Sequence, residues 1–429
     1  MTNSLEAKCY EPTQPQKSII LTDKFYNNKH ISVIAGWCRI NEPVNFDNLE
    51  LAINKLVENN DAYRIVFTKD ENGIHQHFTD YSTLKLEKIL VKKPEDIENF
   101  LKSISFDIFS EPPVKFTLFE DDNGKGGYTC CIHHSISDAW SITLMLEDVL
   151  KCYYKLVNNE DTSDMRSSSY TNFINSSNEY LESEKYGKDK AYWESIFSTP
   201  IEHIEIRKND NPFDTACNRL SFCVPQKVNE YCKNEKVSPF SLFFAAISIY
   251  LSRVYSTKEI TLGTPILNRT NFLEKNTAGM FVSTLPFRLT IDENISAKNL
   301  IQKISINQMG LLRHQKYPYS KLQEFYAQKF GRQNNLYDIL FSYQNARTKN
   351  NEFNLDYETK WVFSGHQAEA LVMNVSDIDN TGNLCVDYDY LVSTFTNENI
   401  SDMHYRILAI LDQIISNAEI LVKEIDIVT

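Results

Sequence analysis

The sequence contains no apolar run that approaches the roughly 18 residues needed to span a membrane. The N-terminal segment 1–8 also lacks the basic and then apolar composition of a signal peptide. No low-complexity tail and no tandem period are present. We therefore expect a cytoplasmic protein with no membrane span.

The nine cysteines include one adjacent pair, Cys130 and Cys131, but no C-x-x-C motif. Their number is odd and their neighbours are apolar, which favours reduced core thiols over a disulfide frame or a metal site. Six of the histidines show no metal-ligand spacing, and we expect no metal site. They are His30, His75, His77, His203, His366 and His404.

Acidic residues outnumber basic ones, 57 to 44, and the net charge of −13 repels phosphate backbones. We therefore expect no nucleic-acid partner. The hydrophobic content of 42%, with 25 Phe and 23 Tyr, is typical of a globular protein. A chain of 429 residues is too long for one core and predicts two lobes.

The hydrophobic periodicity predicts a mixed α/β (α+β) chain. After a polar leader, the expected strands and helices of the first lobe are a strand over 29–40, a helix over 47–60, a hairpin over 63–78, a helix over 94–104 and a hairpin over 114–133. Segment 158–169 has almost no apolar residues, which is typical of a connector. It divides the chain into an N-terminal lobe, 1–165, and a C-terminal lobe, 166–429. In the second lobe, one charged helix is predicted over 171–197 and a deeply buried one over 240–255.

The stretch 128–141 stands out because a strand, a polar loop and the start of a helix follow one another. His133 and His134 lie where the strand ends, and Asp138 lies where the helix begins. A histidine in this position can face a cleft. The same H-H-x-x-x-D spacing also fits a buried histidine pair with an aspartate that caps the helix.

These residues resemble the H-H-x-x-x-D-G motif of nonribosomal peptide synthetase condensation domains, a branch of the chloramphenicol acetyltransferase superfamily. Other family motifs follow in the family's order along nearly the whole chain. The matching segments are Tyr63–Phe67, Tyr170–Phe173, Gly263–Arg269, Gly279–Arg288, His314–Tyr319 and Leu336–Asn345. The departures are Ala139 for glycine, Ser283 for asparagine, Asn59 for arginine and Asn172 for aspartate. An alanine at 139 is tolerable if its φ is negative and damaging if it is positive.

The resemblance implies two chloramphenicol-acetyltransferase-like lobes that form a V-shaped pseudo-dimer around a central tunnel. A loop over 263–290 would form the tunnel floor, and a hairpin over 371–392 would be a latch between the lobes. Ser283, Thr284 and Tyr317 are candidates for the tunnel wall, although packing alone would also explain them.

The resemblance further implies that His134 is the catalytic residue, either as a general base or as a hydrogen-bonding positioner of the attacking amine. His133 is expected to bond the backbone of the loop. The backbone N–H groups of Ala139 and Trp140 are candidates to stabilise a developing oxyanion, because they begin a helix.

Asp138 is not expected to act as a base. On the family pattern it pairs with an arginine that holds the loop, for which Arg288 is the first candidate and Arg64 the second.

The implied reaction is amide formation between a donor acyl thioester and the α-amine of an aminoacyl-carrier protein. Because the first strand begins close to Met1, we expect a starter domain, which N-acylates the first residue of a lipopeptide. Substrates would arrive on the phosphopantetheine of carrier proteins or as acyl-coenzyme A, and the protein would hold no cofactor of its own. Donor and acceptor carriers, and an adjoining adenylation domain, are the expected partners of a monomer. The alternatives are a coenzyme A-dependent acyltransferase of the same superfamily and a non-catalytic carrier-docking platform.

Overall fold

A computed structural model describes residues 8–204, 206–207, 211–331, 335–344, 355–377 and 383–428. The chain forms two compact units, each with its own sheet and helices. The first comprises 1–182, 269–282 and 348–366, and the second 183–268, 283–347 and 367–429. The mixed α/β class is therefore confirmed. The single division expected at residue 165 differs from this grouping, because two later segments return to the first unit.

The first unit contains a five-stranded sheet in the order β11-β1-β6-β5-β4. Its strands are β1 (Val33–Pro43), β4 (Glu87–Leu90), β5 (Val114–Glu120), β6 (Lys125–His133) and β11 (Tyr357–Val362). Its helices are α1 (Gln14–Tyr26), α2 (Phe46–Asn59), α3 (Pro94–Lys102), α4 (Ala139–Val157), α5 (Thr171–Leu181) and α9 (Phe272–Lys275). A hairpin of β2 (Ile65–Asp70) and β3 (Gly73–Phe78) stands apart from the sheet. The expected polar leader thus contains a helix, α1.

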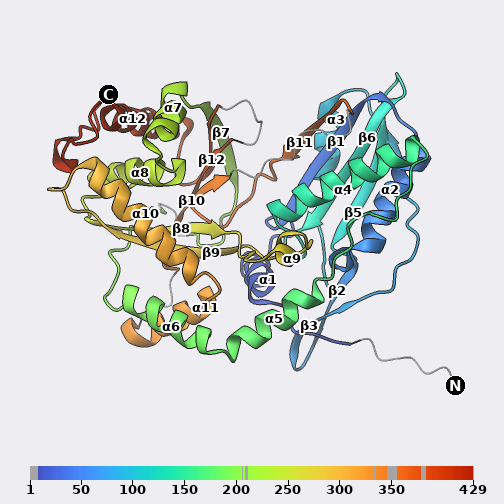
Figure 1. Cartoon of the computed structure of the whole chain (residues 1–429), viewed down its shortest axis with the longest axis horizontal. Helices are drawn as coiled ribbons and strands as arrows, with labels where there is room; N and C mark the ends of the chain where they lie inside the picture. Colours follow the sequence, from blue (N-terminus) through green and yellow to red (C-terminus); the bar gives the residue numbers. More distant parts are fainter. Residues whose placement is uncertain are drawn as a thin grey trace. The chain divides into compact units, whose positions relative to one another are not determined.

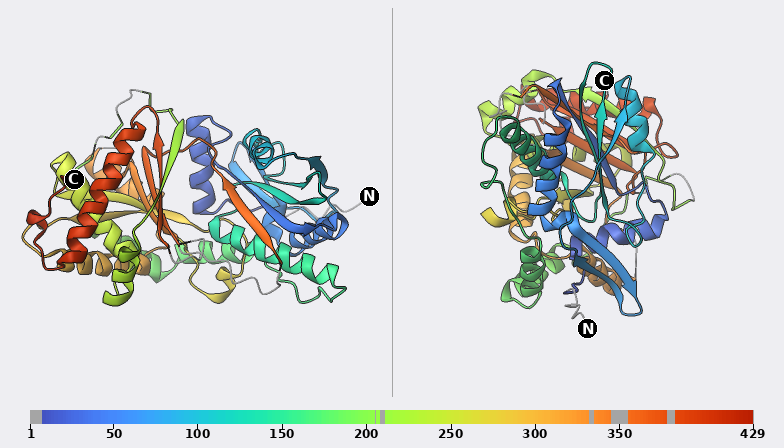
Figure 2. Two further views of the ribbon diagram at one scale, coloured as in Figure 1. Left: turned by 90° about the horizontal axis from the view of Figure 1, so that it is seen from above. Right: turned by 90° about the vertical axis from the view of Figure 1, so that its right-hand side faces the viewer.

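Helices cover both faces of this sheet. Helices α2 and α4 lie side by side on one face, and α3 lies on the other (Figure 2). The central strand β6 is consequently buried along nearly its whole length. It ends at His133, so the histidine loop begins where this buried central strand ends.

The second unit has a six-stranded sheet in the order β7-β13-β12-β10-β8-β9 (Figure 1). The strands are β7 (Cys217–Cys223), β8 (Glu259–Ile266), β9 (Ser283–Thr290), β10 (Ile339–Gln344), β12 (Leu371–Ser376) and β13 (Cys385–Leu391). The helices are α6 (Glu184–Ile196), α7 (Gln226–Glu235), α8 (Pro239–Tyr255), α10 (Ala297–Arg313), α11 (Tyr319–Phe330) and α12 (Asn397–Ser416). Helix α8 packs on β8 and β10 and is almost entirely buried, as its apolar sequence predicts.

One predicted helix needs correction, and the expected latch and floor loop stay predictions. The single helix predicted over 171–197 is two helices, because Ser183 caps a new helix by accepting a hydrogen bond from the Tyr186 N–H. Within the expected latch 371–392, Leu371–Ser376 and Cys385–Leu391 form β12 and β13 of the second sheet. It is β11 that joins a later part of the chain to the first sheet, where it pairs antiparallel with β1. Of the expected floor loop 263–290, only 269–282 belongs to the first unit.

In the described part of the chain, no single helix is long and apolar enough to cross a membrane. Helices α7 and α8 meet the length and composition criteria only as a pair, and they meet at a bend of 117°.

Candidate active site around the histidine loop

The first histidine of the pair is buried and held from two sides. His133 Nε2 lies 2.6 Å from Asp23 Oδ2 on α1, and Nδ1 lies 2.8 Å from the Ser135 hydroxyl. The Ser135 backbone N–H also donates to Nδ1, at 3.2 Å. Because Nδ1 accepts this bond, the ring proton belongs on Nε2, where it is donated to the Asp23 carboxylate. His133 therefore bonds the loop backbone, as expected, and additionally ties the loop to α1.

His134 is oriented differently. Its backbone N–H donates to the Ser32 carbonyl at 2.7 Å, while its side chain is only partly buried. Nδ1 of the ring is out of contact with solvent and has no hydrogen-bond partner among the described residues. Burial lowers the pKa of His134 below its usual value, although the Asp138 charge opposes the shift. The ring is therefore neutral near pH 7 and can accept a proton.

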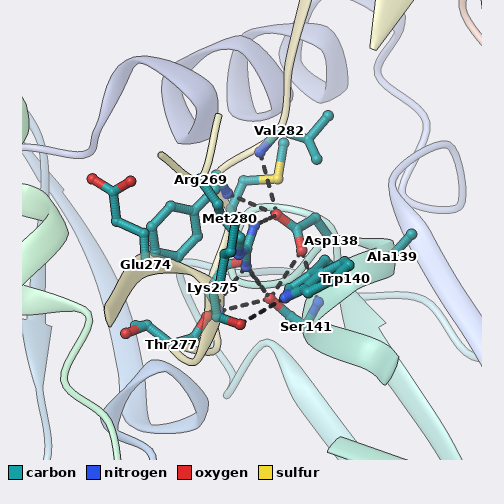
Figure 3. Close-up of polar contacts among 12 residues, drawn as sticks. Asp138, Ala139, Trp140, Ser141, Arg269, Glu274, Lys275, Thr277, Met280 and Val282 are labelled. Atoms are coloured by element: carbon teal, nitrogen blue, oxygen red, sulfur yellow. Dashed lines mark hydrogen bonds and ion pairs between the residues drawn. The ribbon is translucent and has the colours of Figure 1, made fainter. Parts of the chain in front are cut away.

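Asp138 accepts hydrogen bonds on both carboxylate oxygens and is completely buried. Oδ1 accepts from the Ser141 N–H at 2.9 Å, which makes Asp138 the N-cap of α4. Oδ2 accepts from Arg269 Nη1 at 2.6 Å and from the backbone N–H groups of Phe281 and Val282, at 3.0 and 3.2 Å (Figure 3). Burial raises the pKa of Asp138, but the charge and hydrogen bond of Arg269 outweigh it and the pKa falls below its usual value. A carboxylate bonded in this way is ionised and is not a base for substrate.

The partner of Asp138 is thus Arg269, and neither Arg288 nor Arg64 fills that role. Arg288 lies in the second unit, where it pairs with Glu259 at 2.7 Å and donates to backbone carbonyls near Thr199. Arg64 donates to the carbonyls of Val57, Glu58 and Thr79. The signal for Arg269 was present in the sequence, since this residue ends the matched segment Gly263–Arg269.

The loop 269–282 is built around the guanidinium of Arg269. Nη2 donates to the Ser141 hydroxyl at 2.8 Å and to the Thr277 carbonyl at 3.2 Å, and the guanidinium lies 3.9 Å from the centre of the Phe281 ring. Tyr170, the residue before α5, supports the loop, because its hydroxyl donates to the Met280 carbonyl at 2.6 Å. The matched segments around residues 170 and 279 therefore pack together and hold Arg269 against Asp138.

Ala139 and Trp140 begin α4. The φ of Ala139 is not positive, so the alanine in place of the family's glycine costs no backbone strain. The Trp140 indole N–H donates to the Lys275 carbonyl at 2.8 Å. No hydrogen bond among the described residues uses the backbone N–H of either residue, as is usual for the first turn of a helix.

The remaining candidates, Ser283, Thr284 and Tyr317, lie in the second unit. Ser283 and Thr284 start β9 and are half-buried, opposite Ile266 and Pro265 of β8. Tyr317 is buried beside Tyr186, with ring centres 5.5 Å apart. Their role as tunnel residues stays a prediction. Asn345, in the last matched segment, lies outside the described residues.

No group of three His, Cys, Asp or Glu side chains that could hold a metal occurs in the part of the chain that the structure describes.

Known proteins match this chain over nearly its whole length. The family model for the condensation domain matches residues 6–429. Surfactin synthase subunit 1 and one of the plipastatin synthase subunits, both of Bacillus subtilis (strain 168), are each 28% identical to this chain, over 99% and 97% of its length. The chain spans only 12% and 17% of those two proteins.

Solved structures share the fold. The starter condensation domain of rhizomide synthetase, in complex with C8-CoA, superposes with a TM-score of 0.84 at 18% identity, covering 98% of both chains. The first condensation domain of the calcium-dependent antibiotic synthetase, in complex with a substrate analogue, gives a TM-score of 0.82 at 16% identity, covering 98% of this chain and 99% of the other. The chloramphenicol-acetyltransferase-like fold implied by the sequence is therefore confirmed.

Proposed function

Because this chain belongs to the condensation domain family, an acyltransferase family of nonribosomal peptide synthetases, we propose that it joins a donor acyl thioester to the α-amine of an aminoacyl-carrier protein. We propose further that the acceptor is the first residue of the peptide and that the donor is a fatty or other acyl group. The observation that carries the proposal is the neutral ring of His134, placed at the end of β6 by a loop whose aspartate is fully engaged elsewhere.

His134 supplies the proton acceptor in this proposal. An α-amine has a reference pKa of about 7.7–8.0, so part of it is uncharged near neutral pH. The amine attacks the thioester carbonyl, and the imidazole orients it and takes up its proton as the tetrahedral intermediate forms. On collapse of the intermediate the carbon–sulfur bond breaks, and the thiol departs with a proton.

The first turn of α4 supplies hydrogen-bond donors for the negative charge that develops on the thioester oxygen. The backbone N–H groups of Ala139 and Trp140 make no other hydrogen bond with described residues, and they lie at the positive end of the helix dipole. In the proposal they stabilise the oxyanion. Asp138 fixes the start of α4, so its contribution to rate is indirect.

The donor would arrive on the phosphopantetheine of a carrier protein or as acyl-coenzyme A. The similarity to two synthetase proteins supports carrier proteins and an adenylation domain as partners, and the solved starter domain with C8-CoA supports an acyl-coenzyme A donor. The complex of that starter domain with C8-CoA also favours a second candidate function, which is acyl transfer from coenzyme A to a free small-molecule amine or alcohol. A non-catalytic docking role is less well supported, because both His134 and Asp138 are retained.

A reconstitution separates these functions. The purified chain is incubated with an aminoacyl-carrier protein or with the same amino acid in free form. Donors of several acyl lengths are each offered on a carrier and on coenzyme A, and mass spectrometry detects acylation of the carrier and of the free amine. The proposal expects an acylated aminoacyl-carrier with wild type and with His75→Ala, a control in the β2–β3 hairpin, and little product with His134→Ala. Acylation of free amines alone would favour the second candidate. Equal product with wild type and His134→Ala, or none with any donor, would overturn the proposal.

A further inference from the structure

Two cysteines that are 162 positions apart in the sequence, Cys223 and Cys385, lie directly opposite each other on neighbouring strands of the second unit. Cys223 ends β7, the edge strand of the sheet, and Cys385 begins β13. Neither is in a disulfide in the structure. Residues directly opposite each other in an antiparallel pair point to the same face of the sheet. The two thiols are therefore neighbours on one face.

The hydrogen-bond pattern shows which kind of pair they form. The Val224 N–H donates to the Leu384 carbonyl at 2.8 Å, so residues 224 and 384 form a hydrogen-bonded pair. Hydrogen-bonded and non-hydrogen-bonded pairs alternate along an antiparallel ladder, which makes Cys223 and Cys385 a non-hydrogen-bonded pair. Their Cα atoms are then about 4.5 Å apart, within the range of about 4.4–6.8 Å that a disulfide spans.

Side chains on the same face already reach across between these strands. Ser221 donates to Asp387 at 2.6 Å, in the next pair on this face. Arg219 forms a two-bond contact with Asp389, at 2.6 and 2.7 Å, in the pair after that. The cysteines thus continue a row in which Arg219 and Ser221 each contact the opposite residue of β13.

Accessibility distinguishes this pair from the other cysteines. Cys223 is exposed and Cys385 is half-buried, whereas all the others except Cys9 are buried. Among them, Cys130 and Cys131 are adjacent in the sequence, so on a strand their side chains point to opposite faces.

We propose that Cys223 and Cys385 are a redox-sensitive pair that forms a disulfide when the protein meets a peroxide. The exposed Cys223 thiolate attacks one peroxide oxygen, and the oxygen–oxygen bond breaks to give a sulfenic acid and hydroxide. The hydroxide takes up the proton that the thiol had released and becomes water. The Cys385 thiol then attacks that sulfur and displaces a second water. In total, two thiols and one hydrogen peroxide give one disulfide and two waters. A dithiol reductant reverses the step by exchange.

The bond would tie the edge strand to the rest of the sheet. Among the described residues, β7 pairs with β13 alone, so it is held by one ladder. A covalent link closing a long loop constrains the unfolded chain and raises thermal stability when it forms without strain.

The test oxidises the whole chain with hydrogen peroxide, alkylates the remaining thiols and maps cross-linked peptides by mass spectrometry. The proposal expects a Cys223–Cys385 linkage, a loss of two hydrogen atoms in the intact mass and a rise in Tm, all reversed by dithiothreitol. Cys223→Ser and Cys385→Ser should each abolish the linkage and the rise, and Cys9→Ser, the exposed control, should change neither. A peroxide-treated protein in which Cys223 is oxidised to sulfinic acid without a linkage, or in which the two cysteines link to other partners, would overturn the proposal.

Discussion

Asp23 and His133 join α1 to the end of β6 through a contact of 2.6 Å between carboxylate and imidazole. The other carboxylate oxygen of Asp23 accepts from the Ser32 hydroxyl, and the Ser32 carbonyl accepts the backbone N–H of His134. One aspartate therefore steadies the backbone of both histidines.

We expect Asp23→Ala to lower kcat for amide formation by about ten- to a hundredfold, because small displacements of a reacting group are costly. The KM for the aminoacyl-carrier should change little, since Asp23 acts through His133 and not on substrate. Asp23→Asn keeps the shape and can accept the same histidine proton, so it should recover most of the rate. A raised KM with unchanged kcat, or loss of rate in both variants with an unfolded circular dichroism spectrum, would contradict this role.

The buried ion pair between Asp138 and Arg269 is expected to matter for folding. Removing one partner of a buried pair costs about 3–5 kcal/mol, so Asp138→Ala and Arg269→Ala should each lower the free energy of unfolding by about that amount. The double variant should be less destabilised than the sum, because the residues share one interaction. Urea denaturation of the four proteins measures the coupling.

Arg288→Ala is the matched control for this cycle. Arg288 pairs with Glu259 and does not contact Asp138, so its effect should add to that of Asp138→Ala. Strong coupling between positions 138 and 288, and none between 138 and 269, would show that the pairing described above is wrong.

Gly279 adopts a backbone conformation that other residues avoid. Its φ is +146°, and a Cβ atom placed there would lie 2.2 Å from the Tyr170 ring. Gly279→Ala should therefore destabilise the protein by about 2 kcal/mol or more and loosen the loop that holds Arg269. Gly187→Ala is the control, because its Cβ would meet no atom within 4 Å and the residue lies within α6. Equal unfolding midpoints for the two variants would contradict the prediction.

The pH dependence of the rate should reflect the burial of His134. Because burial lowers the pKa of His134 below 6.5, the ring stays neutral, and able to accept a proton, to lower pH than a free histidine. The α-amine contributes an acid-side ionisation near its own pKa of about 7.7–8.0, which should remain in every variant. The ionisation of His134 should add a second, steeper fall of kcat/KM below pH 6.5, and this second fall should be absent in the residual activity of His134→Ala. An acid-side ionisation above pH 6.5 that disappears in His134→Ala would contradict a neutral imidazole at this position.

Burial of His404 should make the free energy of unfolding depend on pH. It is buried beside Tyr388 in the second unit, and burial lowers its pKa from 6.5 to about 4. Between these values the unfolded chain binds a proton that the folded chain does not. Stability is therefore retained above pH 6.5 and lost as the pH falls towards 4, by up to about 3 kcal/mol. His404→Gln cannot titrate, so its free energy of unfolding should vary less with pH over this range, and an unchanged pH dependence would contradict the assignment.

The sequence by itself determined the local structure around the site. An apolar strand, a polar loop and a helical repeat are all short-range patterns, and they placed His134 and Asp138 at the junction of β6 and α4. The helix α8 was equally clear, because proline at its first position and a long apolar run need no tertiary information. The matched segments likewise included Tyr170, Arg269 and Gly279, which the structure brings together in the first unit.

Only the tertiary structure decided which distant side chains meet. Arg269 lies 131 positions from Asp138, and the sequence comparison favoured Arg288 first and Arg64 second as the partner of that aspartate. Strand β11 joins the first sheet, and Cys223 faces Cys385, through strand registers that no local pattern encodes. The physical reason is that helices and turns depend on nearest neighbours, whereas sheet register and buried ion pairs depend on how two remote surfaces pack together.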